Sequence, residues 1–438
     1  MPLEISQKGK IEYAHGNGVH IITTIEEPSE RKKTTGFEVH ISAGGAYYDT
    51  RSGESHFTEH TMVSATRAYS TQDLGRILNG IAAYRNAYTG IRGMTTEISG
   101  HIDDAVLMWQ LIREMTFDPQ IPDNIVEQER RIILAEIARE QTPSKLLNVF
   151  IREQLFPEGN IGRLTSFDVL GAPLSVMGIQ QEHLRLRHQG MISQSEILFV
   201  ISNPGIVRDE ILGFADSLSQ TRAPVPPILF HNGPPYSYYD FRYLPIVHEF
   251  APPHVDAKLL VPCPVTTQNA AIRILFQRIA LVGRVARFSR HARDELGLVY
   301  DLGCGFDIAT QSLEIDATVT QENLGRLVAL FLETIADPEL LQEYESEDRF
   351  DDFKRAFLKR DELESESSPL ADLNFTVNAL RNKGIFVTIE DFRNAVRSVT
   401  IDDLRRFQYE LQTGLSQMRV IGISSDKSLT QTMQQLPK

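Results

Sequence analysis

The pentapeptide His56-Phe57-Thr58-Glu59-His60 carries the residue types of a metal-dependent hydrolase. At about 100° per residue, His56 and His60 lie one turn apart on a helix, and Glu59 falls on the same arc. Two imidazoles at this spacing can bind one Zn²⁺. Glu59 would then lie beside the open coordination position, where a carboxylate can take a proton from water. The pattern therefore predicts a zinc site with a general base.

A simpler interpretation of the pentapeptide is a helix with two surface histidines and an acid. A catalytic zinc site needs a third protein ligand, often His or Glu, and the helix expected after Pro122 offers Glu129, Glu136 and Glu140 on one side. The apolar residues around them are Ile125, Val126, Ile132 and Ile133. Because a buried carboxylate is costly unless paired, these acids either bind a metal or pair with arginines such as Arg130, unless the helix is more exposed than its apolar residues indicate.

The segments that must position these residues predict an α+β fold. Runs rich in Val, Ile and Thr, expected to be strands, cover 19–25, 36–42, 82–89, 93–99 and 196–202. Helices are expected over 54–66, 71–79, 103–115 and 123–141. The second half repeats this style, with strands near 258–261 and 313–319 and a long helix over 270–295.

A proline-rich stretch divides the chain. Because proline stiffens extended backbone, residues 216–245 are expected to be a linker. The sequence thus predicts an N-terminal zinc-binding domain over 1–215 and a C-terminal substrate-binding domain of similar fold over 246–438. The charge-dense stretch 342–368 is expected to be a solvated helix face.

Composition excludes several classes of protein. The 44 Lys and Arg against 58 Asp and Glu give a net charge of −14, so nucleic acid is not an expected partner. No apolar run approaches about 18 residues, so no membrane-spanning helix is expected. The first residues lack the apolar segment of a secretory signal, which makes the cytoplasm the expected compartment. Two cysteines cannot build a disulfide framework.

The zinc pattern and its surroundings resemble the pitrilysin/insulinase family of zinc metallopeptidases, in particular half-length members such as the mitochondrial processing peptidase subunits and bacterial relatives. The similarity runs through the segments 41–45 (ISAGG) and 53–60 (GESHFTEH). In that family the third ligand is a Glu about 76 residues after the second His, and another Glu precedes it by seven. Glu136 and Glu129 stand at these places. The resemblance implies that Glu136 is a zinc ligand, that Glu129 supports the site, and that Glu140 is structural.

Two further motifs are similar to the family. Asn86-Ala87-Tyr88-Thr89 resembles its edge strand, whose main chain pairs with an extended peptide substrate. Arg293 and Tyr300 resemble the pair that holds the substrate carbonyl and stabilises the oxyanion. Without the zinc motif, these segments would be interpreted as an ordinary strand, a helix-terminal arginine and a core tyrosine.

The sequence also departs from the family. Thr58 and Thr61 stand where Leu and Met are usual, and residues 90–93 lack the usual acid and aromatic. These changes concern helix packing and the strand edge rather than the metal ligands.

The resemblance implies a zinc metalloendopeptidase that holds one Zn²⁺ per chain and cleaves peptides or unfolded segments in a closed chamber, with Glu59 as general base. Because the chain carries both the zinc motif and the Arg293/Tyr300 pair, a homodimer is expected, and a heterodimer stays open. The acidic charge favours basic peptides as substrates. The alternatives are a non-catalytic zinc-binding structural or partner subunit of a processing-peptidase-like complex, and a carrier that binds metal without hydrolysis.

Overall fold

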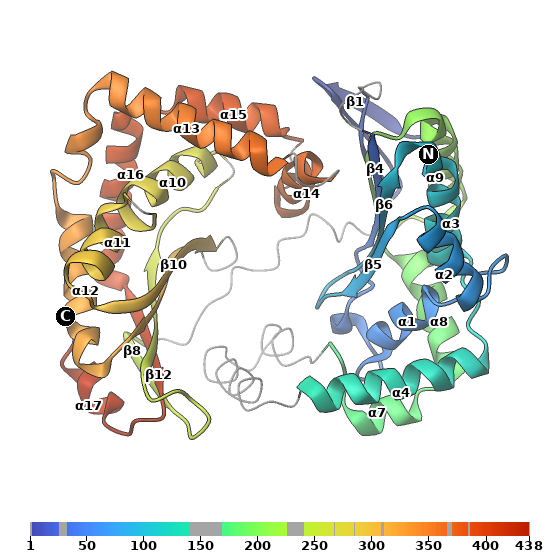
Figure 1. The fold of residues 1–438 in the computed structure, drawn as a ribbon, viewed down its shortest axis with the longest axis horizontal. Coiled ribbons are helices and arrows are strands. Elements are labelled where there is room, and N and C mark those ends of the chain that lie inside the picture. The colour runs from blue at the N-terminus through green and yellow to red at the C-terminus, as the bar shows by residue number, and fades with distance from the viewer. Residues whose placement is uncertain are drawn as a thin grey trace. The chain divides into compact units, whose positions relative to one another are not determined.

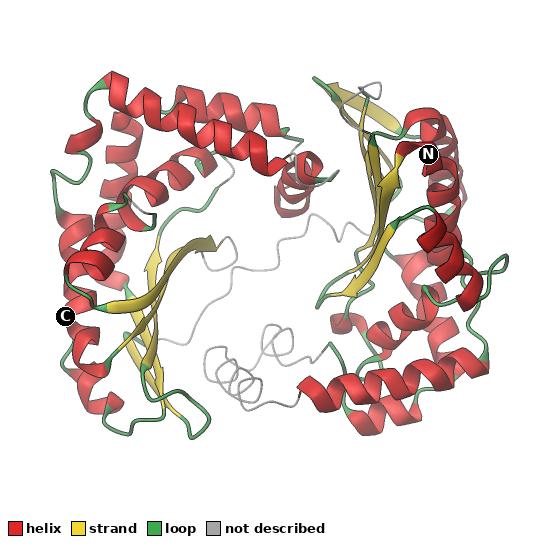
Figure 2. Cartoon of the chain, in the orientation of Figure 1, coloured by secondary structure: helices red, strands yellow, loops and turns green. Residues whose placement is uncertain are grey.

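The computed structural model describes residues 2–25, 33–140, 169–225, 241–266, 268–283, 285–307, 311–365, 370–383 and 386–437. The chain forms two compact units (Figure 1). The first comprises Met1–Gln141, Arg163–His231 and Leu363–Ile389, and the second Thr142–Gly162, Asn232–Glu362 and Glu390–Lys438. Each unit contains a sheet and several helices (Figure 2), which confirms the predicted α+β class.

The first unit contains a seven-stranded sheet with the order β1-β2-β3-β7-β4-β6-β5. Its strands are β1 (Glu4–Lys8), β2 (Ile11–Gly16), β3 (Val19–Thr24), β4 (Thr34–Ile41), β5 (Tyr84–Thr89), β6 (Met94–His101) and β7 (Ile197–Ser202). Only β3 and β7 are parallel neighbours. The strand order places β1 at one edge of the sheet and β5 at the other. The sequence pattern predicts neither β1 nor β2, and all residues of β1 are exposed and carry no alternation of buried and exposed positions.

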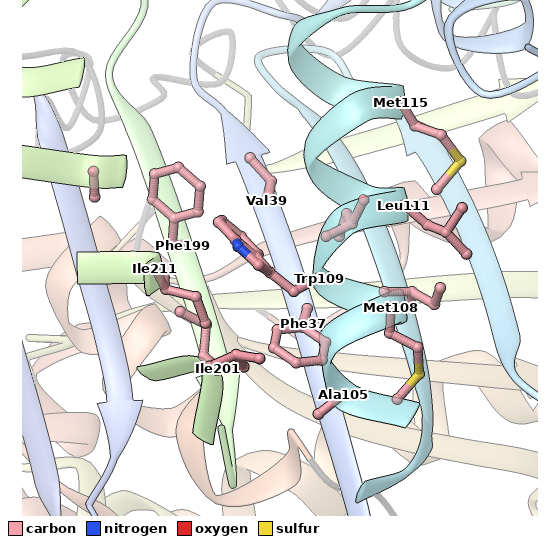
Figure 3. Close-up of a cluster of buried hydrophobic side chains, with 14 of the residues drawn as sticks. Phe37, Val39, Ala105, Met108, Trp109, Leu111, Met115, Phe199, Ile201 and Ile211 are labelled. Atoms are coloured by element: carbon pink, nitrogen blue, oxygen red, sulfur yellow. The ribbon is translucent and has the colours of Figure 1, made fainter. Parts of the chain in front are cut away.

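Seven α-helices accompany this sheet in the described residues before β8. They are α1 (Glu54–Met62), α2 (Thr71–Gly80), α3 (Ala105–Phe117), α4 (Asp123–Glu140), α7 (Pro173–Gly178), α8 (Gln181–Gln194) and α9 (Arg208–Thr221). The helices α2, α3 and α9 pack on one face of the sheet, where Trp109 lies between Phe37 and Phe199 (Figure 3). Phe37 and Val39 point into this core because side chains alternate along a strand.

The helix α14 (Ala371–Lys383) covers the opposite face of the same sheet. Leu373, Val377 and Leu380 pack there against Ile11, Tyr13, Ile22, Leu198 and Val200 of the strands β2, β3 and β7. The alternate residues of β7 belong to the core around Trp109. The strand β7 is therefore buried on both faces, which explains its continuous apolar sequence.

The position of α14 differs from the predicted division of the chain. The expected C-terminal domain over 246–438 is interrupted, because the apolar side of α14 is buried against the first sheet. The expected linker 216–245 begins inside α9 and ends inside β8, and its residues 226–240 lie outside the described ones. The boundaries at 215 and 245 stay predictions.

The sheet of the second unit repeats five strands of the first. Its order is β10-β11-β9-β12-β8, formed by β8 (Tyr243–Val247), β9 (Val255–Pro262), β10 (Val299–Asp307), β11 (Ser312–Val319) and β12 (Arg419–Ser424). The first three pairs are antiparallel and β12 and β8 are parallel. The series β5-β6-β4-β7-β3 has the same order and directions. This shared topology agrees with the prediction of two similar domains.

The helices of the second unit correct one prediction. They are α10 (Ala270–Phe276), α11 (Arg287–Ser289), α12 (Gln321–Ala336), α13 (Glu347–Ser365), α15 (Ile389–Ser398), α16 (Ile401–Gly414) and α17 (Leu429–Gln434), with the π-helical segments η4 (Gln277–Leu281) and η5 (Arg290–Glu295). The single helix expected over 270–295 is wrong, because Val282 is extended and Gly283 has a φ of 154°. Across the described parts of the chain, every helix is too short or too polar to span a bilayer.

Candidate metal centre

The helices α1 and α4 bring three candidate ligands together. The Nε2 atoms of His56 and His60 are 3.2 Å apart, and each lies 3.7 Å from Oε2 of Glu136. A tetrahedral ion with ligand bonds of about 2.0–2.1 Å holds its donor atoms about 3.3 Å apart. The three donors therefore fit around one zinc ion. Among the described residues, His56, His60 and Glu136 form the one group of His, Cys, Asp or Glu side chains whose ligand atoms lie close enough to hold a metal ion.

Glu129 lies behind this group rather than in it. Its Oε2 is 3.0 Å from Nδ1 of His60, and its Oε1 accepts a 3.0 Å hydrogen bond from the Ser64 hydroxyl. A carboxylate on Nδ1 leaves Nε2 of His60 available as a metal ligand and fixes the orientation of the ring. Ser64 was not among the predicted site residues, although it follows His60 by four positions and its hydroxyl donates to the His60 carbonyl.

The remaining residues of α4 distinguish the two interpretations of its acids. Arg130 does not neutralise Glu129 or Glu136, because it pairs with Glu127 at 3.0 Å and donates to the carbonyls of Val176 and Ile179. Near the end of the helix, Arg139 lies 3.5 Å from Oε1 of Glu140 and 3.9 Å from Oε1 of Glu136, whereas Oε2 of Glu136 faces the two histidines. Ile132, expected in the apolar stripe, is 45% exposed. That part of the prediction is wrong, because the side of α4 that carries Ile132 faces solvent.

Glu59 is buried next to the three donors. Its Oε2 accepts a 2.9 Å hydrogen bond from the Thr89 hydroxyl at the end of β5. Burial raises the pKa of Glu59, which His60 and the Thr89 hydrogen bond oppose and the charge of Glu136 reinforces. A carboxyl group whose pKa is raised toward neutrality is suited to accept a proton as a general base.

The pKa of His60 responds to the same acids. Burial lowers it, but the hydrogen bond to Glu129 and the charges of Glu59, Glu129 and Glu136 outweigh burial, so the net direction is upward. The surrounding carboxylates therefore stabilise the charged form of His60. A divalent cation would satisfy the same carboxylates and compete with that proton.

The threonines that replace the family's apolar residues are accommodated within α1. The Thr58 hydroxyl donates to the carbonyl of Glu54 at 2.8 Å, and the Thr61 hydroxyl donates to the carbonyl of Phe57 at 3.0 Å. Both side chains are fully buried. Bonds to carbonyls one turn earlier satisfy hydroxyls that would otherwise be costly to bury.

The other predicted site residues lie on two strands and a π-helical segment. Asn86 and Ala87 lie on β5, at the edge of the first sheet. Arg293 lies in η5 and Tyr300 on β10 of the second unit, and both are exposed. With 86% of its surface exposed, Tyr300 is not a core residue. The substrate-binding roles of these four residues stay predictions.

The region that contains the candidate metal centre is similar to a known protein family. Residues 23–165 match the sequence model of insulinase, peptidase family M16. This region is therefore similar to an M16 peptidase domain. It includes α1, α4 and β5, and thus every residue of the candidate metal centre.

Relatives of the M16 domain carry names that include zinc. An uncharacterized zinc protease of Mycobacterium tuberculosis is 24% identical over 302 residues, which cover 66% of this chain and 66% of the relative. An uncharacterized zinc protease of Streptomyces coelicolor is 27% identical over 172 residues, covering 38% of this chain and 36% of the relative. The chain therefore matches at most about two thirds of the length of these relatives.

Solved structures share the fold of the whole chain. The periplasmic protease PqqL of Escherichia coli has a TM-score of 0.71 and 15% identity, with 97% of this chain and 47% of that chain covered. A peptidase M16 inactive domain from Pseudomonas fluorescens has a TM-score of 0.69 and 15% identity, with 97% and 98% covered. The similarity thus extends beyond the M16 domain, and the fold occurs in both a protease and a domain named inactive.

Proposed function

We propose that this chain is a zinc endopeptidase in which His56, His60 and Glu136 hold one Zn²⁺. The observation that carries the proposal is the set of donor distances, 3.2, 3.7 and 3.7 Å, beside a buried glutamate. When bound, zinc would polarise the scissile carbonyl and acidify a water molecule. Glu129 would support the site by holding the ring of His60.

Glu59 is the general base of the proposed reaction. It would take a proton from the attacking water and pass it to the leaving amine. Its burial and the raised pKa support this role, and the Thr89 hydroxyl holds its carboxylate in place. Arg293 and Tyr300 are proposed to stabilise the oxyanion, a role for which their solvent exposure leaves them accessible.

The edge strand β5 is the proposed binding site for the substrate main chain. Among the described residues, it pairs with β6 on one side and with no strand on the other, so an extended peptide can add as a further strand along Asn86 and Ala87. The end of β5 leads to Thr89 and thereby to Glu59. A peptide held on this strand would therefore lie next to the proposed base. We further propose that its substrates are basic peptides, that the chain forms a homodimer and that it is located in the cytoplasm.

A non-catalytic zinc-binding or partner subunit is the second candidate. One observation favours it, since a structure of the same fold is named an inactive domain. The presence of all three donors and of Glu59 in one cluster favours the peptidase.

The two candidates are separated by metal content and cleavage. The purified chain is treated with a chelator, reloaded with zinc, and assayed on a quenched peptide library beside the variant Glu59→Gln. A peptidase should bind about one zinc per chain, lose cleavage with the chelator and regain it with zinc, while Glu59→Gln should bind zinc without cleaving. Wild type that holds zinc and cleaves nothing, alone or after mixing with cell extract, would favour the partner subunit.

A further inference from the structure

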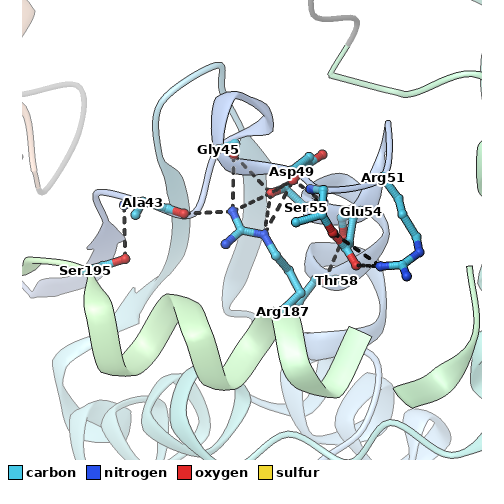
Figure 4. Close-up of polar contacts among 10 residues, drawn as sticks. Ala43, Gly45, Asp49, Arg51, Glu54, Ser55, Thr58, Arg187 and Ser195 are labelled. Atoms are coloured by element: carbon cyan, nitrogen blue, oxygen red, sulfur yellow. Dashed lines mark hydrogen bonds and ion pairs between the residues drawn. The ribbon is translucent and has the colours of Figure 1, made fainter. Parts of the chain in front are cut away.

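The helix α1 has no side chain of its own at its N-cap. Gly53 occupies that position with a φ of 86°, a left-handed conformation that favours glycine. The carboxylate of Asp49 supplies the missing acceptor from outside the helix. Its Oδ1 accepts a 3.0 Å hydrogen bond from the backbone N–H of Ser55 and a short one from the Ser55 hydroxyl (Figure 4). Ser55 directly precedes His56.

Arg187, on α8, ties the same turn to the preceding loop. Its Nε and Nη2 donate to the Ser55 hydroxyl oxygen at 3.1 and 2.8 Å, and Nε is 3.5 Å from Oδ1 of Asp49. Nη2 also lies 2.7 Å from the carbonyl of Ala43 and 3.2 Å from that of Gly45. One guanidinium therefore joins α8, the segment after β4 and the first turn of α1.

The two charges are deeply buried. The side chain of Asp49 is 2% exposed and that of Arg187 is 10% exposed. Removing one partner of such a pair leaves the other charge buried without compensation, so its neighbours must rearrange. Both charges contact Ser55, in the turn of α1 that leads into His56. His56 must stay within about 0.5 Å of its position to share one ion with His60 and Glu136.

We infer that Asp49 and Arg187 are positioning residues that hold the first turn of α1 so that His56 reaches the metal. The inference rests on the proposed zinc site and adds to it two residues that contact no ligand atom. The anchor formed by Asp49, Ser55 and Arg187 acts on metal affinity through the backbone of α1. This is the outer support that metal sites commonly need beyond their ligands.

The test compares the full-length chain with the variants Arg187→Gln, Arg187→Lys and Asp49→Asn. A matched control is Arg208→Gln, because Arg208 pairs with Glu12 at 2.6 Å in the same unit without contacting α1. Zinc dissociation constants are measured by competition with a chromophoric chelator, and the absorption spectrum of the Co²⁺-loaded protein reports the ligand geometry. Melting temperatures of the metal-free proteins report stability separately.

Arg187→Gln should weaken zinc binding by about 10–100-fold and alter the Co²⁺ spectrum, with Arg187→Lys intermediate and Asp49→Asn affected in the same direction. Arg208→Gln should change the melting temperature while leaving the zinc constant unchanged. If Arg187→Gln does not fold, Asp49→Asn decides the question with the same two readouts. Variants that bind zinc as wild type does, with an unchanged Co²⁺ spectrum, would refute the positioning role of Asp49 and Arg187 but not the proposed zinc site. Wild type without zinc affinity would instead overturn the proposed function.

Discussion

The hydroxyl of Thr89 donates a 2.9 Å hydrogen bond to the carboxylate of Glu59. Thr89 ends the strand β5, and Glu59 lies on α1, so this bond joins the proposed peptide-binding strand to the proposed base. The carboxylate is thereby oriented from the side of the substrate rather than from its own helix. Substrate binding and base positioning should depend on each other.

The variant Thr89→Val is expected to lower kcat by about tenfold, since a misplaced general base loses part of its 10²–10⁴-fold contribution. KM should change less, because the main chain of β5 remains in place. Steady-state kinetics on one quenched peptide give both constants. Thr89→Ser keeps the hydroxyl and serves as the control. Equal loss in the serine and valine variants would mean that the hydrogen bond is not the cause.

Glu129 should matter for metal affinity although it is not a ligand. The variant Glu129→Ala removes the carboxylate 3.0 Å from Nδ1 of His60, so zinc binding should weaken by about 10–100-fold. Glu140→Ala is the matched control on the same helix, because that side chain is 44% exposed and pairs with Arg139. Competition titrations with a chelator measure the zinc dissociation constants of both variants. Similar zinc constants for the two variants would contradict the support that we assign to Glu129.

Zinc should stabilise the folded chain by mass action. At a free zinc concentration about 1,000 times the dissociation constant, the gain is about 4 kcal/mol. Differential scanning calorimetry with and without zinc checks this. The double variant His56→Ala/His60→Ala should show no rise in melting temperature with zinc. A rise that persists in this variant would place the stabilising ion elsewhere.

Asp49 should make the stability of the metal-free protein depend on pH. Burial raises its pKa to about 6, despite the hydrogen bonds from Ser55 and the charge of Arg187. A carboxyl group whose pKa is higher in the folded than in the unfolded state contributes stability at low pH and loses it as the pH rises through the folded pKa. The unfolding free energy of wild type should therefore fall between pH 5 and pH 7.5 by roughly 1 kcal/mol more than that of Asp49→Asn. Urea titrations at both pH values test this, and parallel pH profiles would exclude Asp49 as the source.

The grouping of the candidate metal ligands could be predicted because their signals are periodic. His56, Glu59 and His60 lie on one helix face by spacing alone, and helical periodicity also brings Glu129 and Glu136 to one side of α4. Periodicity alone does not show that α1 and α4 pack together. Their packing is expected because one ion must be shared between them. The core strands β3, β4 and β7 were found for a similar reason, since their apolar runs follow from burial.

The residues that the sequence analysis missed depend on packing between distant segments. Arg187 meets Ser55 across 132 positions of the chain, and neither residue carries a local signal for that contact. The break in the helix expected over 270–295 depends on the backbone of Val282, which is extended, and of Gly283, whose φ is 154°. The α+β class and the candidate ligands were thus accessible from local patterns, whereas the residues that support the candidate ligands were not.

The placement of α14 affects whether the N-terminal part of the chain can be expressed as a separate fragment. A fragment that ends near residue 215 would contain all seven strands of the first sheet but would leave Ile22, Leu198 and Val200 open to water, since these residues pack against α14. Such a fragment should aggregate when expressed alone. Supplying a synthetic peptide that covers residues 370–389 should restore its solubility, because that peptide carries the missing half of the interface.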